Sequence, residues 1–393
     1  MTMTTNHQGI SVAIDATRNR SGGAITHIRG ILAASDPRDH GIREVHVWSY
    51  RKLLDSLPDV SWLVKHHDAA LEGPLRQQMT WQRRHLSRAV RAAGCDVLLT
   101  TDAGSVCRHR PSVAMSRDML SFEPGEIDRY SRLSAAWLRL KALQYVQVAS
   151  LRKASGALFL TRYAQSVISR YTGALSQSRV IPHGIGDNFR AAGPRTEPPS
   201  SSAPEIRCVY VSNADRYKHQ WHVLTALDIA RQRGIPLTLQ LIGAGSGPSA
   251  DRVAERLAQL PHLSPYVEVL GATPHDQVPA MLEGADIFVF ASSCENMPNT
   301  LIEGMAAGLP VACAERGPMP EILQDGGAYF NPEDPMSIAD ALCRLATDDA
   351  FALTSARRSF ELAQQFSWRR CAVETWSYLR DVATDTRAVR STS

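Results

Sequence analysis

IFVFASSCENMPNTLIEGMAAGLPV, residues 287–311, is the stretch that decides the fold of this chain. Its first six residues, 287–292, are apolar or small and predict a buried strand, and the polar run 293–299 predicts a loop. A helical pattern begins at Thr300 and ends before Gly308. In such a unit the N-terminus of the helix lies beyond the carboxyl end of the strand. Its unpaired N–H groups and partial positive charge favour an anion there, and phosphate most naturally.

Two carboxylates flank this junction, Glu295 in the loop and Glu303 one turn inside the helix, with the spacing E-x7-E. Acidic side chains do not bind phosphate directly, but they accept hydrogen bonds from the hydroxyl groups of a ribose or a hexose. A sugar joined to a nucleotide by a diphosphate would use both the anion site and the acids. The alternative is structural, because Thr300-x-x-Glu303 is also a capping box in which Glu303 only satisfies the backbone of its own helix.

The residues around the two glutamates, E-N-M-P-N-T-L-I-E-G-M-A-A-G-L-P-V, resemble the donor-binding signature of retaining glycosyltransferase family 4. The resemblance implies a GT-B fold, in which two α/β domains with Rossmann-like, doubly wound parallel sheets face each other across a cleft. It also implies transfer of a sugar with retention at the anomeric carbon and without a protein nucleophile. Residues 296–299 depart from the family pattern, which commonly has glycines and an aromatic residue there. The matching positions are Glu295, Glu303, Met305, Ala306, Gly308, Pro310 and Val311.

A chain of 393 residues is too long for one ordinary domain and predicts two domains of about 180 residues each. We expect an N-terminal, acceptor-side domain over 1–192, a Pro- and Ser-rich linker over 193–204 and a nucleotide-sugar-binding domain over 205–366. Residues 367–393 include a segment that resembles the closing helix of the family, which crosses back to the first domain. The composition, 44% hydrophobic and 21% charged residues, is that of a soluble globular protein.

The sequence indicates a cytoplasmic protein. Residues 1–8 lack the basic start and the apolar core of a signal peptide, and no segment approaches about 18 uninterrupted apolar residues. The seven cysteines are odd in number and form no C-x-x-C pair, which favours reduced thiols and disfavours a zinc site. We expect the chain in the cytoplasm, either free or peripheral on the inner face of the plasma membrane.

Charge is distributed unevenly along the chain. Residues 1–192 hold 26 Lys and Arg against 15 Asp and Glu, whereas the remainder holds 17 against 24. The basic first half predicts an anionic partner or substrate. Two basic amphipathic patterns, 76–91 and 129–153, are typical of helices that lie in an anionic membrane interface. The alternative, which we favour, is that their apolar stripes pack on the sheet. Nucleic-acid binding is disfavoured because no recognition motif accompanies the charge.

Short apolar strands alternate with helical patterns in the first half, which predicts a parallel sheet covered on both faces. The first strand, 9–15, leads into a loop that contains Gly22 and Gly23. The family resemblance implies that this loop meets the diphosphate. It also implies that Asp118 lies close to the transferred sugar, although Arg117 replaces the histidine that commonly precedes this aspartate.

In the second half, a strand at 206–212 is followed by a helix with Lys218 at its mouth. A lysine there supplies a mobile cation for a diphosphate and for the charge that develops on a leaving nucleoside diphosphate. Alone it would be interpreted as a surface lysine, and the family spacing favours the functional interpretation. Family members usually carry an arginine five residues earlier; that position is Asn213 here, and Arg216 is the nearby substitute.

A glycine-rich turn, Gly243-Ala-Gly245-Ser-Gly247, follows the next predicted strand. It resembles a dinucleotide fingerprint, but Pro248 interrupts the G-x-G-x-x-G spacing and no acid lies at the required distance. The family resemblance identifies it instead as a donor-facing turn. The loop that ends at Thr273 is, by the same resemblance, the border of the nucleotide base.

The resemblance assigns a role to each candidate residue. Glu295 would hold hydroxyls of the donor sugar, Glu303 would hold the ribose, and the amides of Asn299, Thr300 and Leu301 would hold the phosphates. We regard Glu295, Lys218 and Asp118 as catalytic, and the remaining candidates as donor-binding. No D-x-D pair occurs in the chain, so we expect neither a metal nor a cofactor besides the sugar nucleotide. The donor-binding set is Gly22, Gly23, Asn213, Arg216, Lys218, Gly243, Thr273, Glu295, Asn299, Thr300, Leu301 and Glu303.

The expected activity is transfer of a hexose from a nucleoside-diphosphate sugar to a saccharide or lipid-linked saccharide acceptor in polysaccharide biosynthesis. The wording YKHQ at 217–220 resembles members that build bacterial surface polysaccharides such as lipopolysaccharide, often from mannose-like donors, so GDP-mannose is the expected donor. One alternative is a catalytically inactive module that binds a nucleotide or a lipid. Another is a nicotinamide-dependent oxidoreductase, based on the glycine-rich turn; NAD but not GDP or UDP would then stabilise it.

Overall fold

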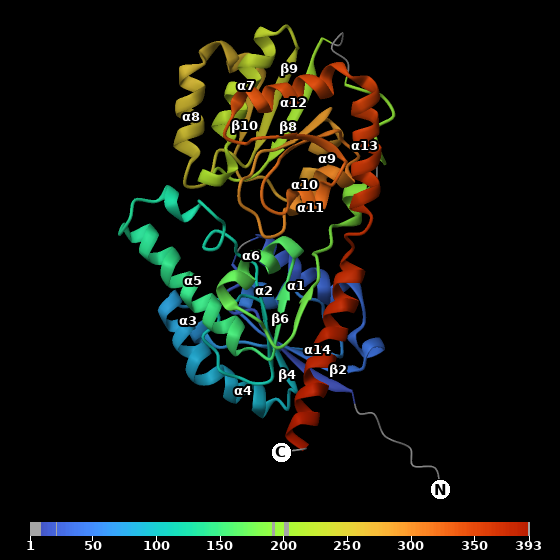
Figure 1. Ribbon diagram of the computed structural model, residues 1–393. Coiled ribbons are helices and arrows are strands. Elements are labelled where there is room, and N and C mark those ends of the chain that lie inside the picture. Colours follow the sequence, from blue (N-terminus) through green and yellow to red (C-terminus); the bar gives the residue numbers. More distant parts are fainter. Residues whose placement is uncertain (1–8, 21, 191–192, 200–203, 392–393) are drawn as a thin grey trace. The chain divides into compact units, whose positions relative to one another are not determined.

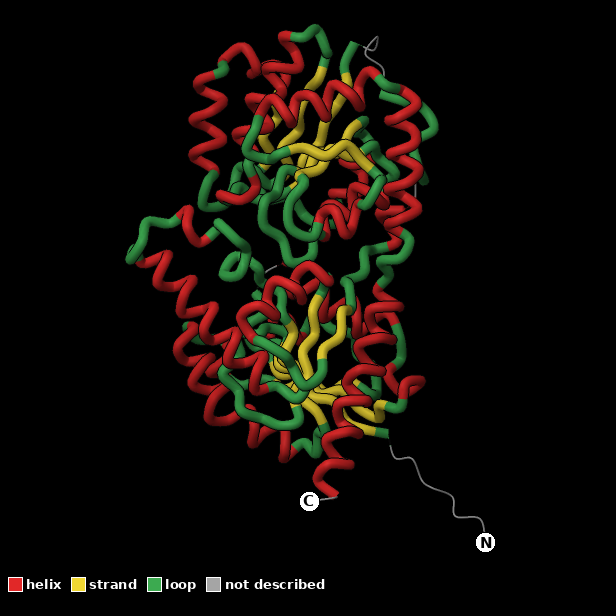
Figure 2. The backbone as a smooth tube through the Cα atoms, viewed as in Figure 1, coloured by secondary structure: helices red, strands yellow, loops and turns green. Residues whose placement is uncertain are grey.

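Parallel strands form the frame of both halves of the chain. The computed structural model describes residues 9–20, 22–190, 193–199 and 204–391. Their contacts divide the chain into unit 1, Met1–Gly184 with Ser367–Ser393, and unit 2, Ile185–Phe366. Each unit is a parallel sheet with helices packed against it, so the predicted α/β class is confirmed (Figures 1 and 2).

The sheet of unit 1 has seven strands in the order β3-β2-β1-β4-β5-β6-β7. The central strands are mostly apolar and are buried along their whole length, as expected for a sheet with both faces covered. The strand order reverses between β1 and β4, which pair from Val12 with Val97 to Asp15 with Thr100. The strands are β1 Ile10–Asp15, β2 Ile42–Trp48, β3 Leu63–His66, β4 Val97–Thr100, β5 Ser112–Met115, β6 Gly156–Phe159 and β7 Ser178–Val180.

Seven α-helices belong to unit 1 in the described part of the chain. The last of them, α14, returns after the whole of unit 2 to pack on α1 and on the strands β1, β4 and β5. Gly30 of α1 permits this contact, because a Cβ there would lie within 2.7 Å of three atoms of the Trp368 ring. The helices are α1 Gly22–Ala34, α2 Arg51–Leu54, α3 Leu75–Trp81, α4 Ser87–Ala92, α5 Ala135–Lys153, α6 Arg162–Thr172 and α14 Trp368–Ser391.

Unit 2 repeats the same plan with six strands in the order β10-β9-β8-β11-β12-β13. The order reverses between β8 and β11, where Ile287 pairs with Cys208 and Phe288 with Val209. The strands are β8 Ile206–Val211, β9 Leu237–Ile242, β10 Val267–Leu270, β11 Ile287–Phe290, β12 Val311–Ala314 and β13 Gly327–Phe330. The helices are α7 Gln220–Gln232, α8 Ala250–Gln259, α9 Val278–Glu283, α10 Asn299–Ala306, α11 Met319–Leu323, α12 Pro335–Thr347 and α13 Asp349–Ala363.

Two helical predictions in unit 1 need correction. The pattern 129–153 becomes a helix only at Ala135, because Leu133 has a left-handed φ of 65° and Ser134 caps the helix through the N–H of Trp137. Leu133 is 75% exposed, so the favoured interpretation that the whole apolar stripe packs on the sheet is wrong at this residue. The pattern 76–91 is interrupted by a π-helical turn, Gln82–Leu86.

The expected domain boundaries differ from the boundaries that the contacts among the described residues define. The expected linker, 193–204, packs in part on unit 2, since the N–H of Arg195 donates to the carbonyl of Gly308 at 2.9 Å. Residues 200–203 of that linker, and the leader 1–8, lie outside the described residues. The division of the chain by contacts comes earlier, after Gly184.

Candidate functional site

The candidate site of unit 2 begins where the two central strands of its sheet end. Ligands of doubly wound sheets bind beyond the carboxyl ends of the strands, at the point where the strand order reverses. Here β8 leads to Lys218 and β11 leads to Glu295, and the ammonium of Lys218 donates to the carboxylate of Glu295. Two candidates that lie 77 residues apart in the sequence therefore form an ion pair at the predicted point.

The ammonium of Lys218 is held in an aromatic and largely buried setting. Its side chain is 10% exposed, against 14% for its partner Glu295. The Nζ atom lies 5.1 Å from the centre of the Tyr217 ring and 5.6 Å from that of Phe290, within the range of cation–π attraction. The hydroxyl of Tyr210 donates to the carbonyl of Lys218 at 2.8 Å and fixes the turn. This lysine is not the solvated surface residue of the alternative interpretation.

The loop after β8 is fastened to the loop after β11. The N–H of Ser293 donates to the carbonyl of Tyr217 at 2.7 Å, and the Ser293 hydroxyl lies 2.9 Å from Nε2 of His219. His219 itself has a left-handed φ of 50° between the 3₁₀ turn Arg216–Lys218 and α7. These hydrogen bonds fix the loops after β8 and β11 relative to each other, and so fix the positions of Lys218 and Glu295.

Helix α10 presents its N-terminus beside this pair. It begins at Asn299, and no side chain caps it. The N–H of Asn299 donates to the carbonyl of Met297 at 3.0 Å, so the first of the three expected phosphate-binding amides is engaged within the loop. Thr300, at the next position, is half-exposed, and Leu301 is buried. Partial positive charge at the start of this helix favours an anion.

The capping-box interpretation of Glu303 is wrong. Thr300 lies inside the helix instead of preceding it, and the Glu303 carboxylate does not serve the start of α10. Its Oε1 atom instead accepts a hydrogen bond from Nε2 of His275, at 2.8 Å. Its Oε2 atom is buried and has no hydrogen-bond partner among the described residues. A carboxylate oxygen in this state is an acceptor available to a ligand.

Burial and the His275 contact act in opposite directions on the Glu303 carboxyl. Burial raises the pKa of Glu303, because it disfavours the charged form, while the hydrogen bond from His275 and its charge lower it. The hydrogen bond to Glu303 raises the pKa of His275 above its usual value, against the smaller effect of burial. Each partner thus favours the charged form of the other.

The glycine-rich turn after β9 packs against protein backbone. A Cβ at Gly247, whose φ is 114°, would lie 2.3 Å from the carbonyl oxygen of Ala214, and one at Gly243 would lie 2.9 Å from that of Ser212. The carbonyl of Ser246 accepts from the N–H of Ala214 at 2.8 Å. These glycines therefore allow the loops after β8 and β9 to approach each other, which explains the turn without a bound dinucleotide.

The other donor-binding candidates of unit 2 also follow carboxyl ends of its strands. Asn213 is exposed directly after β8, and Arg216 is half-exposed in the 3₁₀ turn that carries Lys218. Thr273 follows β10, with its hydroxyl donating to the carbonyl of Gly271 at 3.2 Å. Their contacts with a donor stay predictions.

The candidates in unit 1 lie at the carboxyl ends of β1 and β5. Gly22 and Gly23 form the first turn of α1 instead of a loop, and a Cβ at Gly22 would meet no atom within 4 Å. The carboxylate of Asp118 accepts from the N–H of Leu120 at 3.0 Å, and burial raises the pKa of Asp118. Burial also lowers the pKa of Arg117. The roles of Gly22, Gly23 and Asp118 stay predictions.

The residues that contact Lys218 and Glu303 were not predicted from the sequence. His275 lies two residues beyond the loop that was expected to border the nucleotide base, and the rings of Tyr217 and Phe290 flank Lys218. Their positions after β10, β8 and β11 were a usable signal, because the carboxyl ends of parallel strands meet at one edge of a sheet.

Two classes of feature are absent from the described part of the chain. No group of three or more His, Cys, Asp or Glu side chains is placed to hold a metal ion there. Nor does any helix within those residues combine the length and the apolar character needed to cross a bilayer.

Comparison with known sequences identifies the family of unit 2. Residues 205–348 match the family described as glycosyl transferases group 1 and form a domain of that type. The O-antigen chain mannosyltransferase B of Escherichia coli is 29% identical over 110 residues, which are 28% of this chain and 29% of that protein. The colanic acid biosynthesis glycosyltransferase WcaL of Salmonella typhimurium, named as putative, is 28% identical over 155 residues, 36% of this chain and 37% of that protein. The aligned part thus spans well under half of these relatives.

Solved structures share the fold over nearly the whole chain. A sucrose-phosphate synthase from Thermosynechococcus elongatus superimposes with a TM-score of 0.70 at 20% identity, covering 98% of this chain and 100% of that one. Anabaena HepE, solved with UDP and glucose, gives a TM-score of 0.68 at 18% identity over 96% and 100% of the two chains. WaaG, a glycosyltransferase involved in lipopolysaccharide biosynthesis, gives 0.67 at 14% identity over 94% and 99%. The expected GT-B fold is confirmed by these neighbours.

Proposed function

We propose that this chain is a glycosyltransferase that moves a hexose from a nucleoside-diphosphate sugar to a saccharide or lipid-linked saccharide in polysaccharide biosynthesis. The observation that carries the proposal is the ion pair between Lys218 and Glu295 at the reversal point of the unit 2 sheet. A cation, an anion and a helix N-terminus meet there, and a sugar nucleotide carries a diphosphate and hydroxyl groups that match them.

The diphosphate would bind to the positively charged groups of the site. A leaving nucleoside diphosphate gains negative charge in the transition state, so a preorganised cation and oriented amides lower the barrier. Lys218 would move its hydrogen bond from Glu295 to a phosphate oxygen, and the first turn of α10 would supply N–H donors from Thr300. We propose that these groups compensate the charge without a divalent metal ion.

The carboxylates would take the hydroxyl groups. Glu295, released from part of its bond to Lys218, would accept from hydroxyls of the hexose, and the free Oε2 atom of Glu303 would accept from the ribose. Following the path that the family resemblance implies, which needs no protein nucleophile, we propose that the acceptor attacks on the face that the diphosphate leaves. This path gives retention at the anomeric carbon.

We propose mannose as the sugar and GDP-mannose as the donor. The support is the resemblance of the YKHQ segment to mannose-using members, together with a relative named as an O-antigen mannosyltransferase. The basic first half of the sequence, with a net charge of +11 over residues 1–192 from 26 basic and 15 acidic residues, suits an anionic membrane surface that carries the acceptor. The proposed place of action is therefore the inner face of the plasma membrane.

The test is turnover of Glu295→Gln and Glu295→Ala variants, measured as nucleoside diphosphate released from GDP-mannose and an acceptor extract, in buffer that contains a chelator. We expect Glu295→Ala to lose about 10²–10³ of kcat/KM, as for removal of a group that acts in the transition state. Glu295→Gln keeps the size of the side chain and an acceptor for Lys218, and separates chemistry from folding. Glu283→Gln, an exposed carboxylate on α9, is the control with the same change in charge.

Wild-type release by Glu295→Ala would remove Glu295 from the mechanism. If the wild-type protein binds GDP-mannose but releases no GDP with any acceptor extract, the chain is a nucleotide-binding module and not a transferase. The matched variant Glu283→Gln has to keep wild-type release for either conclusion to hold.

A further inference from the structure

A cavity of about 620 Å³ lies in unit 1 over the strands β4 and β5. In a doubly wound sheet the crossover between such strands is usually a helix. Here residues 101–111, all of them described, cross without a helix, and the space that it would fill stays open between this connection, the π-helical turn and α5. The cavity is lined by Arg83, Leu98, Thr100, 105–110, Ser112, Ala114, Tyr145, Val146, Ala149, Ser150, Lys153 and Ala154.

The charged lining of this cavity is entirely basic. Arg83, Arg108, Arg110 and Lys153 are exposed, and no Asp or Glu is among the lining residues. Among the residues that the structure describes, none of these four cations has an ion-pair partner. Arg18 of the same unit, by contrast, is paired with Asp102 at 2.5 Å. Four unpaired cations around one cavity repel each other and attract an anion.

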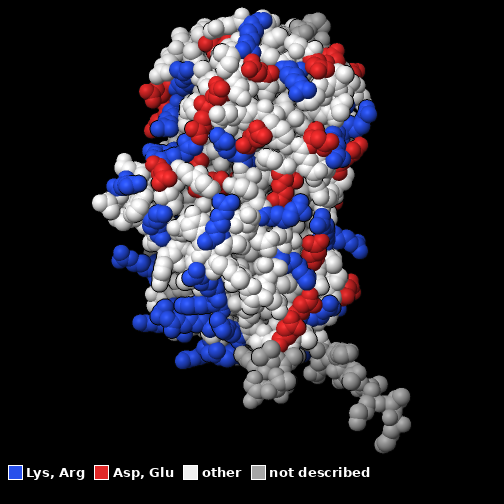
Figure 3. Space-filling view, in the orientation of Figure 1, with Lys and Arg blue, Asp and Glu red and all other residues white. Residues whose placement is uncertain are grey.

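The basic character continues outside the cavity. Arg84, Arg88 and Arg91 are exposed on the π-helical turn and on α4. Figure 3 shows Lys and Arg side chains gathered over the part of unit 1 where Figure 1 places α3 and α4. This field raises the local concentration of anions at the entrance of the cavity.

The connection that covers the cavity is held in place by the π-helical turn and the start of α4. The side-chain carbonyl of Gln82 accepts from the N–H of Val106 at 3.0 Å, and the hydroxyl of Ser87 lies 3.4 Å from Nδ1 of His109. The Gln82 amide also donates to the buried carboxylate of Asp15. π-Helical turns are rare and occur frequently at functional sites. The cavity thus has a fixed wall and not a loose loop.

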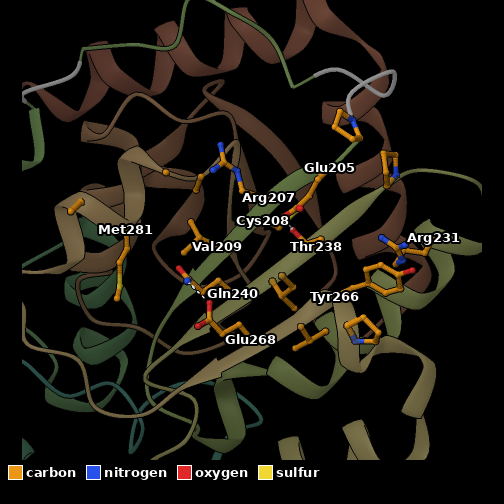
Figure 4. Close-up of a pocket in the computed structure, with 18 residues that line it drawn as sticks. Glu205, Arg207, Cys208, Val209, Arg231, Thr238, Gln240, Tyr266, Glu268 and Met281 are labelled. Atoms are coloured by element: carbon orange, nitrogen blue, oxygen red, sulfur yellow. Dashed lines mark hydrogen bonds between the residues drawn. The ribbon is translucent and has the colours of Figure 1, made fainter.

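Another large cavity, in unit 2, provides a contrast. It measures about 520 Å³ and is drawn in Figure 4. Its polar side chains bind one another: Gln240 donates to Glu268 at 2.7 Å, and Arg231 lies 3.2 Å from the centre of the Tyr266 ring. Both signs of charge occur in its lining. The charged side chains of this cavity thus have partners within the protein, whereas the four basic side chains of the unit 1 cavity have no ion-pair partner among the described residues.

We propose that the unit 1 cavity is an anion site that binds a phosphate-bearing group and shares no residue with the candidate donor site of unit 2. Guanidinium groups of Arg83, Arg108 and Arg110 match phosphate oxygens in bidentate geometry, and Lys153 adds a fourth cation. Hydroxyls of the lining supply further donors, and apolar side chains of the floor receive what the phosphate is attached to. The volume lies within the usual range of small-molecule sites. A soluble phosphate ester and a phospholipid headgroup offer the same chemistry.

The test is isothermal titration of the full-length protein with inorganic phosphate and with dihexanoyl phosphatidic acid below its micelle concentration. We expect saturable binding, and a loss of about tenfold or more in affinity for Arg108→Glu/Lys153→Glu, because charge-assisted hydrogen bonds are lost. The control Lys52→Glu/Arg170→Glu makes the same change in net charge at exposed positions outside the cavity. Ala149→Trp fills the cavity without changing charge and is expected to abolish binding.

The two probes distinguish the sources of the phosphate. Affinities that are equal, or higher for inorganic phosphate, would indicate a soluble phosphate compound as the ligand, and a preference for the phosphatidic acid would indicate a lipid headgroup; all of these support the anion site. Absence of saturable binding, equal losses in the two charge-reversed pairs, or unchanged binding by a folded Ala149→Trp would overturn it. If Arg108→Glu/Lys153→Glu does not fold, Arg108→Gln/Lys153→Gln takes its place.

Discussion

The two units have the same strand order around their reversal points, but the residues gathered there differ in kind. In unit 1 the carboxylate of Asp15 is buried and accepts from the N–H and hydroxyl of Thr17 and from the amide of Gln82. These donors belong to neutral groups of the protein. Burial raises the pKa of Asp15, and these hydrogen bonds only partly offset that effect. Both oxygens of the Asp15 carboxylate therefore accept hydrogen bonds from the protein.

Both reversal points also carry an ion pair between the loops after the two central strands. In unit 1 it joins Arg18 to Asp102, whose side chain is 42% exposed. In unit 2 it joins Lys218 to Glu295, both at least 86% buried, beside the α10 N-terminus and the unpartnered oxygen of Glu303. The paired charges therefore follow from the shared topology. What distinguishes unit 2 is the set of donors and acceptors left over for a ligand.

Replacing the cation of each pair is the change with the largest expected difference. Lys218→Ala should lower kcat/KM for nucleoside diphosphate release by about 10²–10³, because the leaving group loses its cation. Arg18→Ala removes a partly exposed pair, and we expect kcat/KM for the same release to change less than about fivefold. Initial rates measure both. Equal losses in the two variants would remove the functional distinction between the units.

The packing of α10 on β11 is tested by a substitution at Gly304. A Cβ there would lie 2.5 Å from the buried ring of Phe288, so Gly304→Ala should cost up to about 3 kcal/mol of unfolding free energy through overpacking. Gly284→Ala is the matched control, since the nearest atom to its Cβ would be 3.6 Å away. Urea denaturation compares them. Equal stability of the two variants would mean that α10 is not packed as described.

The neutral network of unit 1 is tested by Gln82→Ala. This change leaves the Asp15 carboxylate without its amide donor and the N–H of Val106 without its acceptor. We expect a loss of about 1–2 kcal/mol in unfolding free energy with unchanged affinity for nucleoside diphosphates. A large loss of nucleotide affinity in a folded variant would show that the network contributes to the donor site.

The smallest expected effect concerns His275 and pH. Its pKa is raised in the folded state, so the stability that protonated His275 contributes is fully present below the ordinary histidine pKa and is lost as the pH rises through the folded value. The His275 side chain is 57% exposed, so solvent screens the pair and we expect about 0.2–1 kcal/mol. The urea midpoints of wild type and His275→Gln should therefore differ more at pH 6 than at pH 9. A larger gap at pH 9 would reverse the assignment.

The sequence was sufficient for the strands and for the strand–loop–helix unit around Glu295. Strands such as Val97–Thr100 and Ile287–Phe290 are nearly continuous apolar runs, because both faces of these sheets are buried. The pairing of Lys218 with Glu295 was within reach for the same reason, since both residues follow central strands. The strand Val311–Ala314 was not recognised, because it is only four residues long and follows the proline that ends the preceding helical segment.

Other features depend on backbone details that periodicity does not encode. The late start of α5 results from a left-handed residue, Leu133, which a pattern of apolar positions passes over. The π-helical turn at Gln82–Leu86 shifts every later side chain of the 76–91 pattern around the helix axis. The His275–Glu303 bond joins a loop after β10 to α10, 28 positions away, and only the assembled sheet brings them together.

The most direct test of the central claim is a crystal structure with whichever sugar nucleotide of the GDP, UDP and ADP series raises Tm most. We predict the diphosphate within hydrogen-bond distance of the Lys218 ammonium and the first turn of α10, with sugar hydroxyls on Glu295 and the ribose on Glu303. A ligand bound elsewhere on unit 2, with the Lys218–Glu295 pair and the Glu303 oxygen untouched, would contradict the claim.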